Sequence, residues 1–219
     1  MTKLSKNKKI TIAVLMVTLV AAIAINVSLA YFTQKTDEIT NKFTLGDIDI
    51  DIDEDWDPED GEDMLPGTTV DKAPWIKATE GDSYVRMVMQ VKDKDGVVIT
   101  DATRLAKILY TLRFSTTINA GDKLSTTALA TVKNFNDTAF TYNAALSGNG
   151  VYVYDYNFVL TEGNKTPVLI THVVIPTDWD EADIAILNGP YQVTFTGYGI
   201  QAENLTATEA FAALTDKFF

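Results

Sequence analysis

The chain has 219 residues, a formal net charge of −12 at pH 7 and no cysteine. An acidic charge of this size argues against binding to nucleic acid or to an anionic membrane surface. The lack of cysteine excludes disulfide bonds, thiol catalysis and cysteine–zinc sites, so stability must come from packing, bound ions or assembly.

The first thirty residues have the three-part pattern of a secretory signal peptide. Four lysines within residues 3–9 precede an uncharged apolar run, residues 10–25, and Ser28-Leu29-Ala30 places small residues two positions apart. The apolar run is shorter than the roughly 18 to 20 residues of a membrane-spanning helix. The pattern therefore predicts export, cleavage by a signal peptidase between Ala30 and Tyr31, and membrane contact only before cleavage. An uncleaved membrane anchor is the alternative.

Cleavage would leave a strongly acidic chain of one domain's length. It would retain 219 − 30 = 189 residues, and the loss of the four lysines would bring the net charge to −12 − 4 = −16. A chain of this length can form one proper hydrophobic core or two small ones. We find no internal repeat and no low-complexity linker, so residues 31–219 are predicted to form one domain.

An acidic segment, residues 47–63, opens with alternating aspartate and isoleucine. Side chains alternate between the two faces of a strand, which puts Ile48, Ile50 and Ile52 on one side. The other side then carries only carboxylates, from Asp47, Asp49, Asp51 and Asp53. We therefore predict a half-buried strand with an acidic outer face. A disordered acidic tail would lack β-branched residues at every second position.

Further strand and turn patterns follow along the chain. Leu65-Pro66-Gly67-Thr68 predicts a turn into a strand that begins near Thr69, and Asp95-Gly96 predicts a second turn. Alternating or continuous apolar patterns predict strands over residues 82–91, 97–99, 151–160, 168–175 and 191–198.

Two amphipathic helices interrupt the strands. One is expected over residues 101–112 with Asp101 as its cap, and the other begins at the capping-box pattern Thr206-x-x-Glu209. Short strands with turn signals, and no regular alternation of strand and helix, indicate a mainly β fold. We predict an antiparallel, jelly-roll-like β-sandwich with a few short helices, preceded by the helical signal peptide.

The sequence shows few catalytic signals. Its single histidine, His172, lies in a predicted strand and is interpreted as a buried or edge residue satisfied by a neighbour. There is no His-Glu-x-x-His, no Gly-x-Ser-x-Gly and no phosphate-binding glycine loop. The aromatic stripe Tyr152, Tyr154, Tyr156 and Phe158 is interpreted as a wall of the core rather than an exposed binding platform. No enzyme activity and no required cofactor are predicted.

The acidic segment raises the question of whether the protein binds calcium. No register of the segment satisfies an EF-hand loop, because the residue at position six is Trp56 or Pro58 instead of glycine. Carboxylates on one face of a strand share an ion only if the segment folds back on itself. The hypothesis is then a weak calcium site, whose ligands would come from Asp49, Asp51, Asp53, Asp55, Asp57 and Glu62.

Several short motifs occur in an order that resembles the TasA/camelysin family of exported proteins of Gram-positive bacteria. That family combines a signal peptide cut by a SipW-type peptidase, an aromatic start of the mature chain and a Phe-x-x-Gly-x-Ile-x-Ile strand. The matching segments touch both ends and the middle of the mature chain: residues 29–33, 41–50, 65–70, 84–86 and 199–204.

The resemblance implies a jelly-roll-like sandwich and assembly into extracellular fibres of a biofilm matrix. The amino-terminal segment, residues 31–45, would add as a strand to the next subunit, with Tyr31, Phe32, Phe43 and Leu45 as assembly residues. Partners would be copies of the same chain and other matrix proteins. Some members are classed as metallopeptidases, but this sequence has no zinc-ligand set. A monomeric, calcium-dependent surface adhesion module is the alternative.

Overall fold

The computed structural model describes residues 48–55, 64–114 and 135–218, all of which belong to one compact unit, Thr40–Phe219. The predicted signal peptide and the assembly residues Tyr31, Phe32, Phe43 and Leu45 lie outside the described residues. Every strand pair in the described part is antiparallel. None of the helices there is long and apolar enough to cross a membrane. The mainly β, antiparallel prediction is confirmed.

One layer of the fold is built around a nearly continuous strand. β2 (Thr69–Asp71) and β3 (Ala73–Glu80) are separated only by Lys72, whose N–H group donates to the carbonyl of Thr171 (2.9 Å). β8 (His172–Val174) pairs with β2, and backbone hydrogen bonds from residues 163–169 continue this pairing along β3. The layer is completed by β1 (Asp49–Asp55) beside β3 and β5 (Leu112–Arg113) beside β8.

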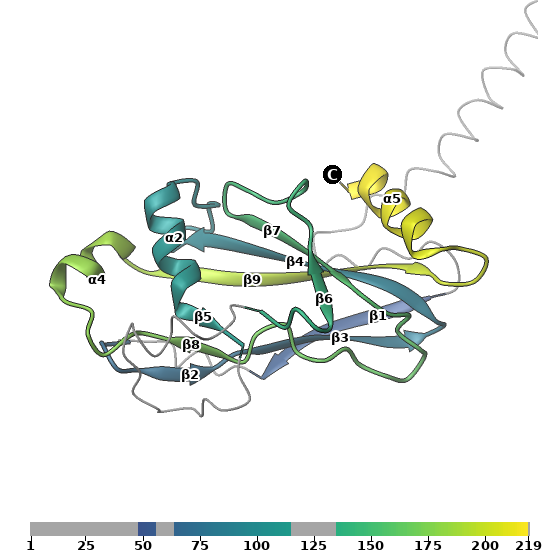
Figure 1. Cartoon of the computed structure of the whole chain (residues 1–219), viewed down its shortest axis with the longest axis horizontal. Coiled ribbons are helices and arrows are strands. Elements are labelled where there is room, and N and C mark those ends of the chain that lie inside the picture. The colour runs from purple at the N-terminus through teal and green to yellow at the C-terminus, as the bar shows by residue number, and fades with distance from the viewer. Residues whose placement is uncertain (1–47, 56–63, 115–134, 219) are drawn as a thin grey trace, which may run out of the picture. The chain divides into compact units, whose positions relative to one another are not determined.

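The other layer has four strands in the order β6, β7, β4 and β9 (Figure 1). Its two long members, β4 (Ser83–Asp93) and β9 (Tyr191–Gln201), pair over their whole length. The shorter strands are β6 (Phe140–Tyr142) and β7 (Val151–Tyr156). β9 therefore forms one edge of this layer.

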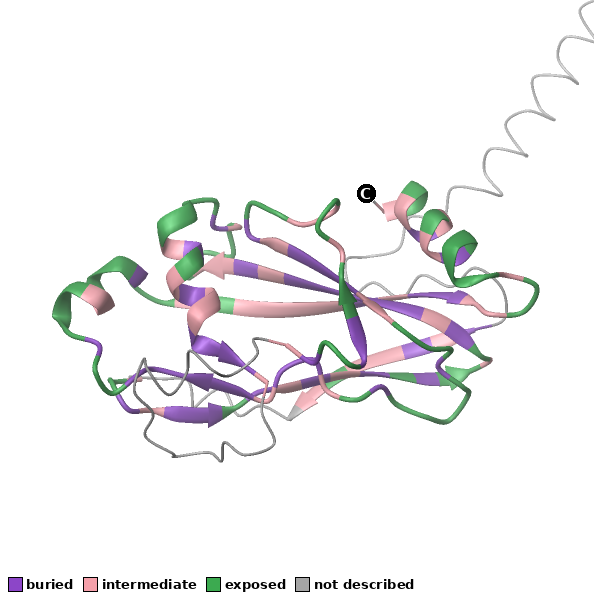
Figure 2. Cartoon of the chain, viewed as in Figure 1, coloured by how far each residue is buried: buried purple, intermediate pink, exposed green. Residues whose placement is uncertain are grey.

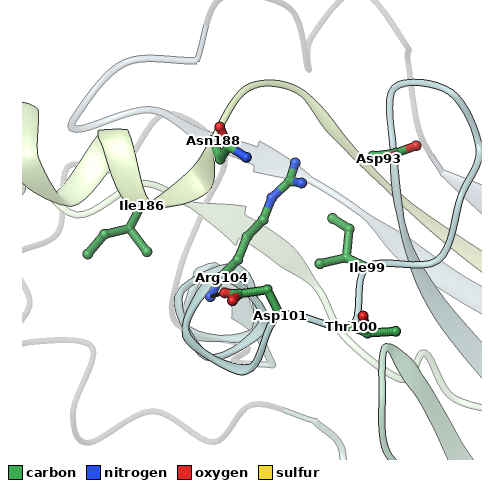
Figure 3. A pocket seen from close by; sticks show the side chains of 7 residues that line it. All are labelled: Asp93, Ile99, Thr100, Asp101, Arg104, Ile186 and Asn188. Atoms are coloured by element: carbon green, nitrogen blue, oxygen red, sulfur yellow. Dashed lines mark hydrogen bonds between the residues drawn. The ribbon is translucent and has the colours of Figure 1, made fainter.

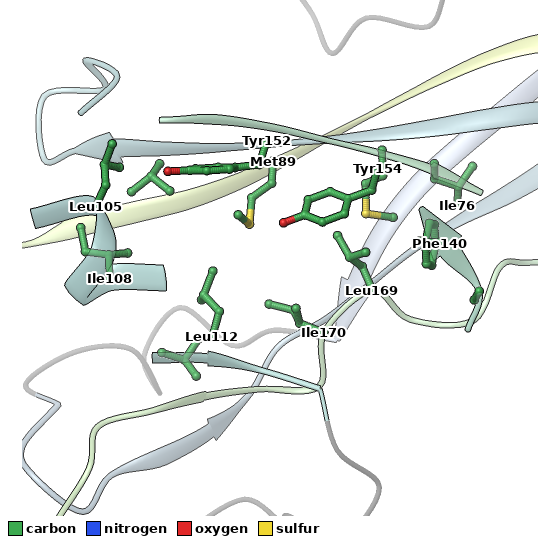
Figure 4. Packing of buried hydrophobic residues seen from close by; sticks show 14 of the residues in the cluster. Ile76, Met89, Leu105, Ile108, Leu112, Phe140, Tyr152, Tyr154, Leu169 and Ile170 are labelled. Carbon is green, nitrogen blue, oxygen red and sulfur yellow. The ribbon is translucent and has the colours of Figure 1, made fainter. Parts of the chain in front are cut away.

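A single large core fills the space between the layers. Val85, Met87, Met89 and Val91 of β4 are at most 1% exposed, as their alternation predicts. Figure 4 shows Tyr152 and Tyr154 of β7 facing apolar side chains that include Leu169 and Ile170. Burial of this mixed aliphatic and aromatic surface is the main favourable term in folding.

The layers approach most closely where β1 crosses β9. A Cβ atom placed on Gly199 would lie 3.1 Å from Ile50 Cδ1, and one on Gly197 would lie 3.3 Å from Ile76. Glycine at these two positions leaves room for the isoleucines of the facing layer. Ile48 and Ile50 are buried and Ile52 is half-buried, so the predicted two-faced strand is confirmed over the described residues.

The described part of the chain has three short helices outside the layers. α2 (Ala102–Thr111) begins at the predicted cap, where Asp101 accepts the N–H group of Arg104 (2.7 Å). α5 (Ala207–Phe218) begins at the predicted capping box, since Thr206 N–H donates to Glu209 Oε2 (2.9 Å). α4 (Glu181–Leu187), closed by its own capping box, is absent from the prediction. Figure 2 shows the outward sides of these helices exposed.

The strand predictions differ from the structure mainly in length. The turn at residues 65–68 and the strand from Thr69 are confirmed. The strand expected over 151–160 ends at Tyr156, that over 168–175 is assigned only at His172–Val174, and that over 97–99 is reduced to a bridge at Val98. β3 is missing from the prediction, because proline and alanine occupy inward positions and weaken its apolar pattern.

Candidate functional site: two open sheet edges

β9 has an open edge as far as the described residues show. Its only strand partner within the described residues is β4. In β4, Val91 and Asp93 donate their N–H groups to loop carbonyls on the side away from β9, both at 2.8 Å. Hydrogen-bonded and non-hydrogen-bonded pairs alternate along an antiparallel ladder. The β9 partners of these residues, Val193 and Tyr191, therefore direct their N–H and C=O groups outward, as does Phe195 two residues further on.

The chemistry of β9 suits the addition of another strand. The eleven residues Tyr-Gln-Val-Thr-Phe-Thr-Gly-Tyr-Gly-Ile-Gln carry no charge, in a chain whose net charge is −12. Val193 and Phe195 face the core side but stay half-buried. Natural proteins usually protect long edge strands with charges, proline or bulges. Nothing of this kind protects β9.

β1 presents the second open edge, on the other layer. In β3, the carbonyls of Pro74, Ile76 and Ala78 accept hydrogen bonds from N–H groups within residues 163–169. These three carbonyls therefore point away from β1. By the same alternation, Ile50, Ile52 and Glu54 direct their backbone groups away from β3. β1 packs across β9, so the two edges lie on the same side of the molecule (Figure 1).

The β1 edge, unlike the β9 edge, is protected by charge. Asp49, Asp51 and Asp53 alternate with the inward residues, and Asp53 Oδ1 accepts the outward N–H group of Glu54 (2.8 Å). A strand added here would have to displace that contact and desolvate carboxylates. The two edges therefore differ in kind, and β9 is the better acceptor.

An ion pair within the β1 layer faces β9 of the other layer. Lys72 Nζ lies 2.8 Å from Glu54 Oε2 of β1 and 5.5 Å from the centre of the Phe195 ring of β9. The Lys72 side chain is 5% exposed and that of Glu54 is 31% exposed. Within the described residues, no group donates a hydrogen bond to Glu54 Oε1. The open side of the core thus contains a carboxylate oxygen that can accept one.

The outer face of β1 is less uniformly negative than its sequence alone indicates. Asp49 Oδ2 accepts a hydrogen bond from Thr79 (2.9 Å), and Asp51 lies opposite Lys77 in the register of β3. Lys165 adds a further positive charge on this face, 4.6 Å above the ring of Trp75. Neighbouring lysines therefore offset part of the carboxylate repulsion.

The calcium ligands proposed from sequence are only partly described. Asp49, Asp51 and Asp53 lie on the outer face of β1, while the side chain of Asp55 and residues Asp57 and Glu62 lie outside the description. In the ranges 48–55, 64–114 and 135–218, no group of three acidic or histidine side chains could hold a metal ion. The calcium hypothesis remains a prediction.

His172 has the surroundings expected of a structural histidine. It is 5% exposed, with Nδ1 2.7 Å from Thr171 Oγ1 and Nε2 3.2 Å from Asp71 Oδ1. Its ring nitrogens are thus satisfied by neighbours, as the sequence interpretation states.

The aromatic stripe of β7 is partly core and partly surface. Tyr152 and Tyr154 are buried, whereas Phe158 is 58% exposed beyond the end of the strand. Burial raises the pKa of Tyr154, reinforced by the nearby Tyr142. The core interpretation is confirmed for the first two members and is wrong for Phe158.

One surface cavity of about 450 Å³ lies between α2, α4 and the end of β4 (Figure 3). Arg104 reaches into this region and donates to the carbonyl of Pro190 (3.2 Å). Asp93 and Asp101 line the same cavity, so its lining includes the Arg104 guanidinium and two carboxylates. None of the residues predicted from sequence to bind a ligand lies here.

Sequence reasoning missed both open edges and the ion pair between them. Lys72 and Glu54 are 18 positions apart, and no motif marks them as partners. Of these features, only the β9 edge has a signal in the sequence, which is the lack of charge over Tyr191–Gln201.

No protein-family model, curated protein or solved structure matches this chain. Its function must therefore be inferred from its residues and their geometry.

Proposed function

We propose that the protein is a secreted structural subunit of extracellular biofilm-matrix fibres. It polymerises by donating its amino-terminal segment, residues 31–45, as a strand to β9 of the next subunit. The observation that carries this proposal is the long, uncharged edge of β9, with outward backbone groups at Tyr191, Val193 and Phe195. An added strand satisfies such groups while its alternate side chains fill pockets.

The strand order supports a jelly-roll-like sandwich with one strand position unfilled. β2 and β3 are counted here as one strand, the second of the described strands. β2 then pairs with β8 (second with seventh) and β8 with β5 (seventh with fourth). In the other layer, β9 pairs with β4 (eighth with third) and β4 with β7 (third with sixth). These four pairings are those of a jelly roll, in which the first strand also pairs with the eighth and the fourth with the fifth. Among the described residues, the first strand, β1, pairs with β3 instead, the fifth, β6, pairs with the sixth, and the eighth, β9, has no strand beyond it.

The donated segment has a pattern that fits this position. Ile39, Asn41, Phe43 and Leu45 share one face if the segment is extended, and three of the four are apolar. That face would meet the half-buried side chains of β9, and the opposite, polar face would meet solvent.

Placing charge on the apolar face should abolish assembly. We expect Phe43→Asp with Leu45→Asp to leave the monomer folded, because the described core is built from residues 48–218, and to prevent fibres from forming. The matched control, Thr40→Asp with Thr44→Asp, adds the same charge to the polar face and should still assemble. Electron microscopy and sedimentation compare the two proteins. Normal fibres from the Phe43/Leu45 variant would contradict strand donation.

Charge on the outer face of β1 should regulate assembly. Packing subunits together concentrates the net charge of −16 expected for the exported chain, so protonating carboxylates at acidic pH, or adding millimolar calcium, should accelerate polymerisation. Changing Asp47, Asp49, Asp51 and Asp53 to asparagine should weaken the dependence of assembly on both pH and calcium. The change should be limited, because Lys77 and Lys165 already offset part of the negative charge on this face. Light scattering against pH and calcium measures the effect. Identical curves for the two proteins would show that the acidic face has no part in assembly.

A further inference from the structure

We infer that the donated segment docks on β9 in one register, which is set by Asn41 against the Glu54–Lys72 ion pair. This inference rests on the proposed function, because it concerns how the segment of one copy is recognised by the next. It assigns one specificity-determining residue to each side of the interface. These are Asn41, through its carboxamide, on the donated segment and Glu54, through a carboxylate oxygen, on the acceptor.

On the acceptor subunit, Glu54 is the group near β9 that calls for a polar partner. An incoming strand beside β9 would pass Phe195, and the Phe195 ring lies 5.5 Å from Lys72 Nζ. The strand would thereby exclude water from Glu54, which is 31% exposed and has Oε1 open to a donor. Burying a carboxylate oxygen without a hydrogen bond is costly, so a segment that supplies a donor here is favoured.

The last part of the segment, residues 39–45, offers one side chain that can supply this hydrogen bond. Of the four residues on its core-facing side, Ile39, Phe43 and Leu45 are apolar and only Asn41 has a polar side chain. Its carboxamide N–H can donate to Glu54 Oε1, and its oxygen can accept from a cation such as Lys72. A shift of two residues would bring isoleucine or phenylalanine to the ion pair instead.

This match fixes the pairing along the strand. The first strand of a jelly roll runs antiparallel to the eighth, as all described pairs of this protein do. With Asn41 opposite Phe195, Phe43 lies opposite Val193 and Leu45 opposite Tyr191. The two apolar residues then meet the half-buried start of β9, away from the end where Gly197 and Gly199 are already covered by isoleucines.

The hydrogen bond can be tested with the segment as a peptide. The probe is a labelled peptide of residues 31–47, and the acceptor is the exported Phe43→Asp/Leu45→Asp protein, whose β9 edge is intact. A hydrogen bond to a charged group predicts that Asn41→Ala weakens peptide binding by about 10- to 100-fold. Asn41→Asp should weaken it further, because two carboxylates would meet. The control peptide with Thr40→Ala should bind normally.

The register can be tested by disulfide trapping, which is unambiguous because the chain has no cysteine. Thr194 and Thr196 bond toward β4, so on the open edge they form the closer, non-hydrogen-bonded type of pair, with Cα atoms about 4.5 Å apart. That spacing allows a disulfide, whereas diagonal neighbours about 7 to 8 Å apart do not form one readily. The inferred register pairs Thr40 with Thr196 and Lys42 with Thr194.

The experiment mixes exported single-cysteine proteins in pairs under mild oxidation. Disulfide dimers are expected from Thr40→Cys with Thr196→Cys and from Lys42→Cys with Thr194→Cys. The crossed combinations, Thr40→Cys with Thr194→Cys and Lys42→Cys with Thr196→Cys, are the matched controls and should give no dimer. Fibres with dimers only in the crossed combinations, or in none, would overturn the register but not strand donation. Proteins that never assemble would overturn the proposed function itself.

Discussion

Replacing Asp155 with alanine is expected to destabilise the monomer by about 3 to 5 kcal/mol, because it removes the carboxylate that pairs with a buried guanidinium. The Arg86 side chain is 1% exposed and makes a two-point contact, with Nε 2.5 Å from Asp155 Oδ1 and Nη2 3.2 Å from Oδ2. Arg86 also donates to Thr215 of α5 (3.0 Å). The pair therefore joins β4, β7 and the carboxyl-terminal helix.

Chemical denaturation of the Asp155→Ala protein measures this loss. Asp95→Ala is the matched control, because the Lys94–Asp95 pair is 67% and 65% exposed and such pairs contribute about 0 to 1 kcal/mol. The double change Arg86→Met with Asp155→Leu removes both charges and should recover much of the stability. A loss below 1 kcal/mol for Asp155→Ala would show that the buried pair does not hold α5 to the sheet.

The second large effect concerns assembly. Val193→Pro should leave the monomer folded and eliminate its ability to accept a strand. The N–H group of Val193 points away from β4, so proline removes a donor from the open edge without removing one from the β4–β9 ladder. An incoming strand would lose that hydrogen bond and meet the proline ring.

Ile52→Pro provides the matched control on the other open edge. Ile52 is also half-buried with an outward N–H group, but it lies in β1, whose edge is protected by carboxylates. This protein should still form fibres. Circular dichroism and thermal melts establish that both variants fold, and sedimentation compares their assembly. Equal loss of assembly in the two proteins would mean that β9 is not the selective acceptor.

Local patterns predicted much of the fold. The alternation of aspartate and isoleucine gave the two faces of β1, and capping residues located the starts of α2 and α5. These signals are readable because they depend on residues a few positions apart. α4 was missed although Asp180 and Asp183 form a capping box, since its seven residues show little periodicity.

The candidate site could not be predicted in the same way, because it depends on which strands are neighbours. β1 pairs with β3, and not with β9, which lies more than a hundred residues later in the chain, and tertiary packing decides this choice. Likewise, the Asp-Ile repeat indicated an acidic face, but not that Lys77 and Lys165 share it. Sequence patterns assign faces to strands, whereas tertiary contacts decide which edges stay open.

Mixing two assembly-defective proteins tests strand donation most directly. The Phe43→Asp/Leu45→Asp protein keeps an intact β9 edge but cannot donate, and the Val193→Pro protein can donate but cannot accept. Each alone should remain monomeric. Size-exclusion chromatography with light scattering should show that the mixture forms a one-to-one particle of twice the monomer mass that does not grow further. A mixture that stays monomeric, or one that forms fibres, would contradict donation of the amino-terminal strand to β9.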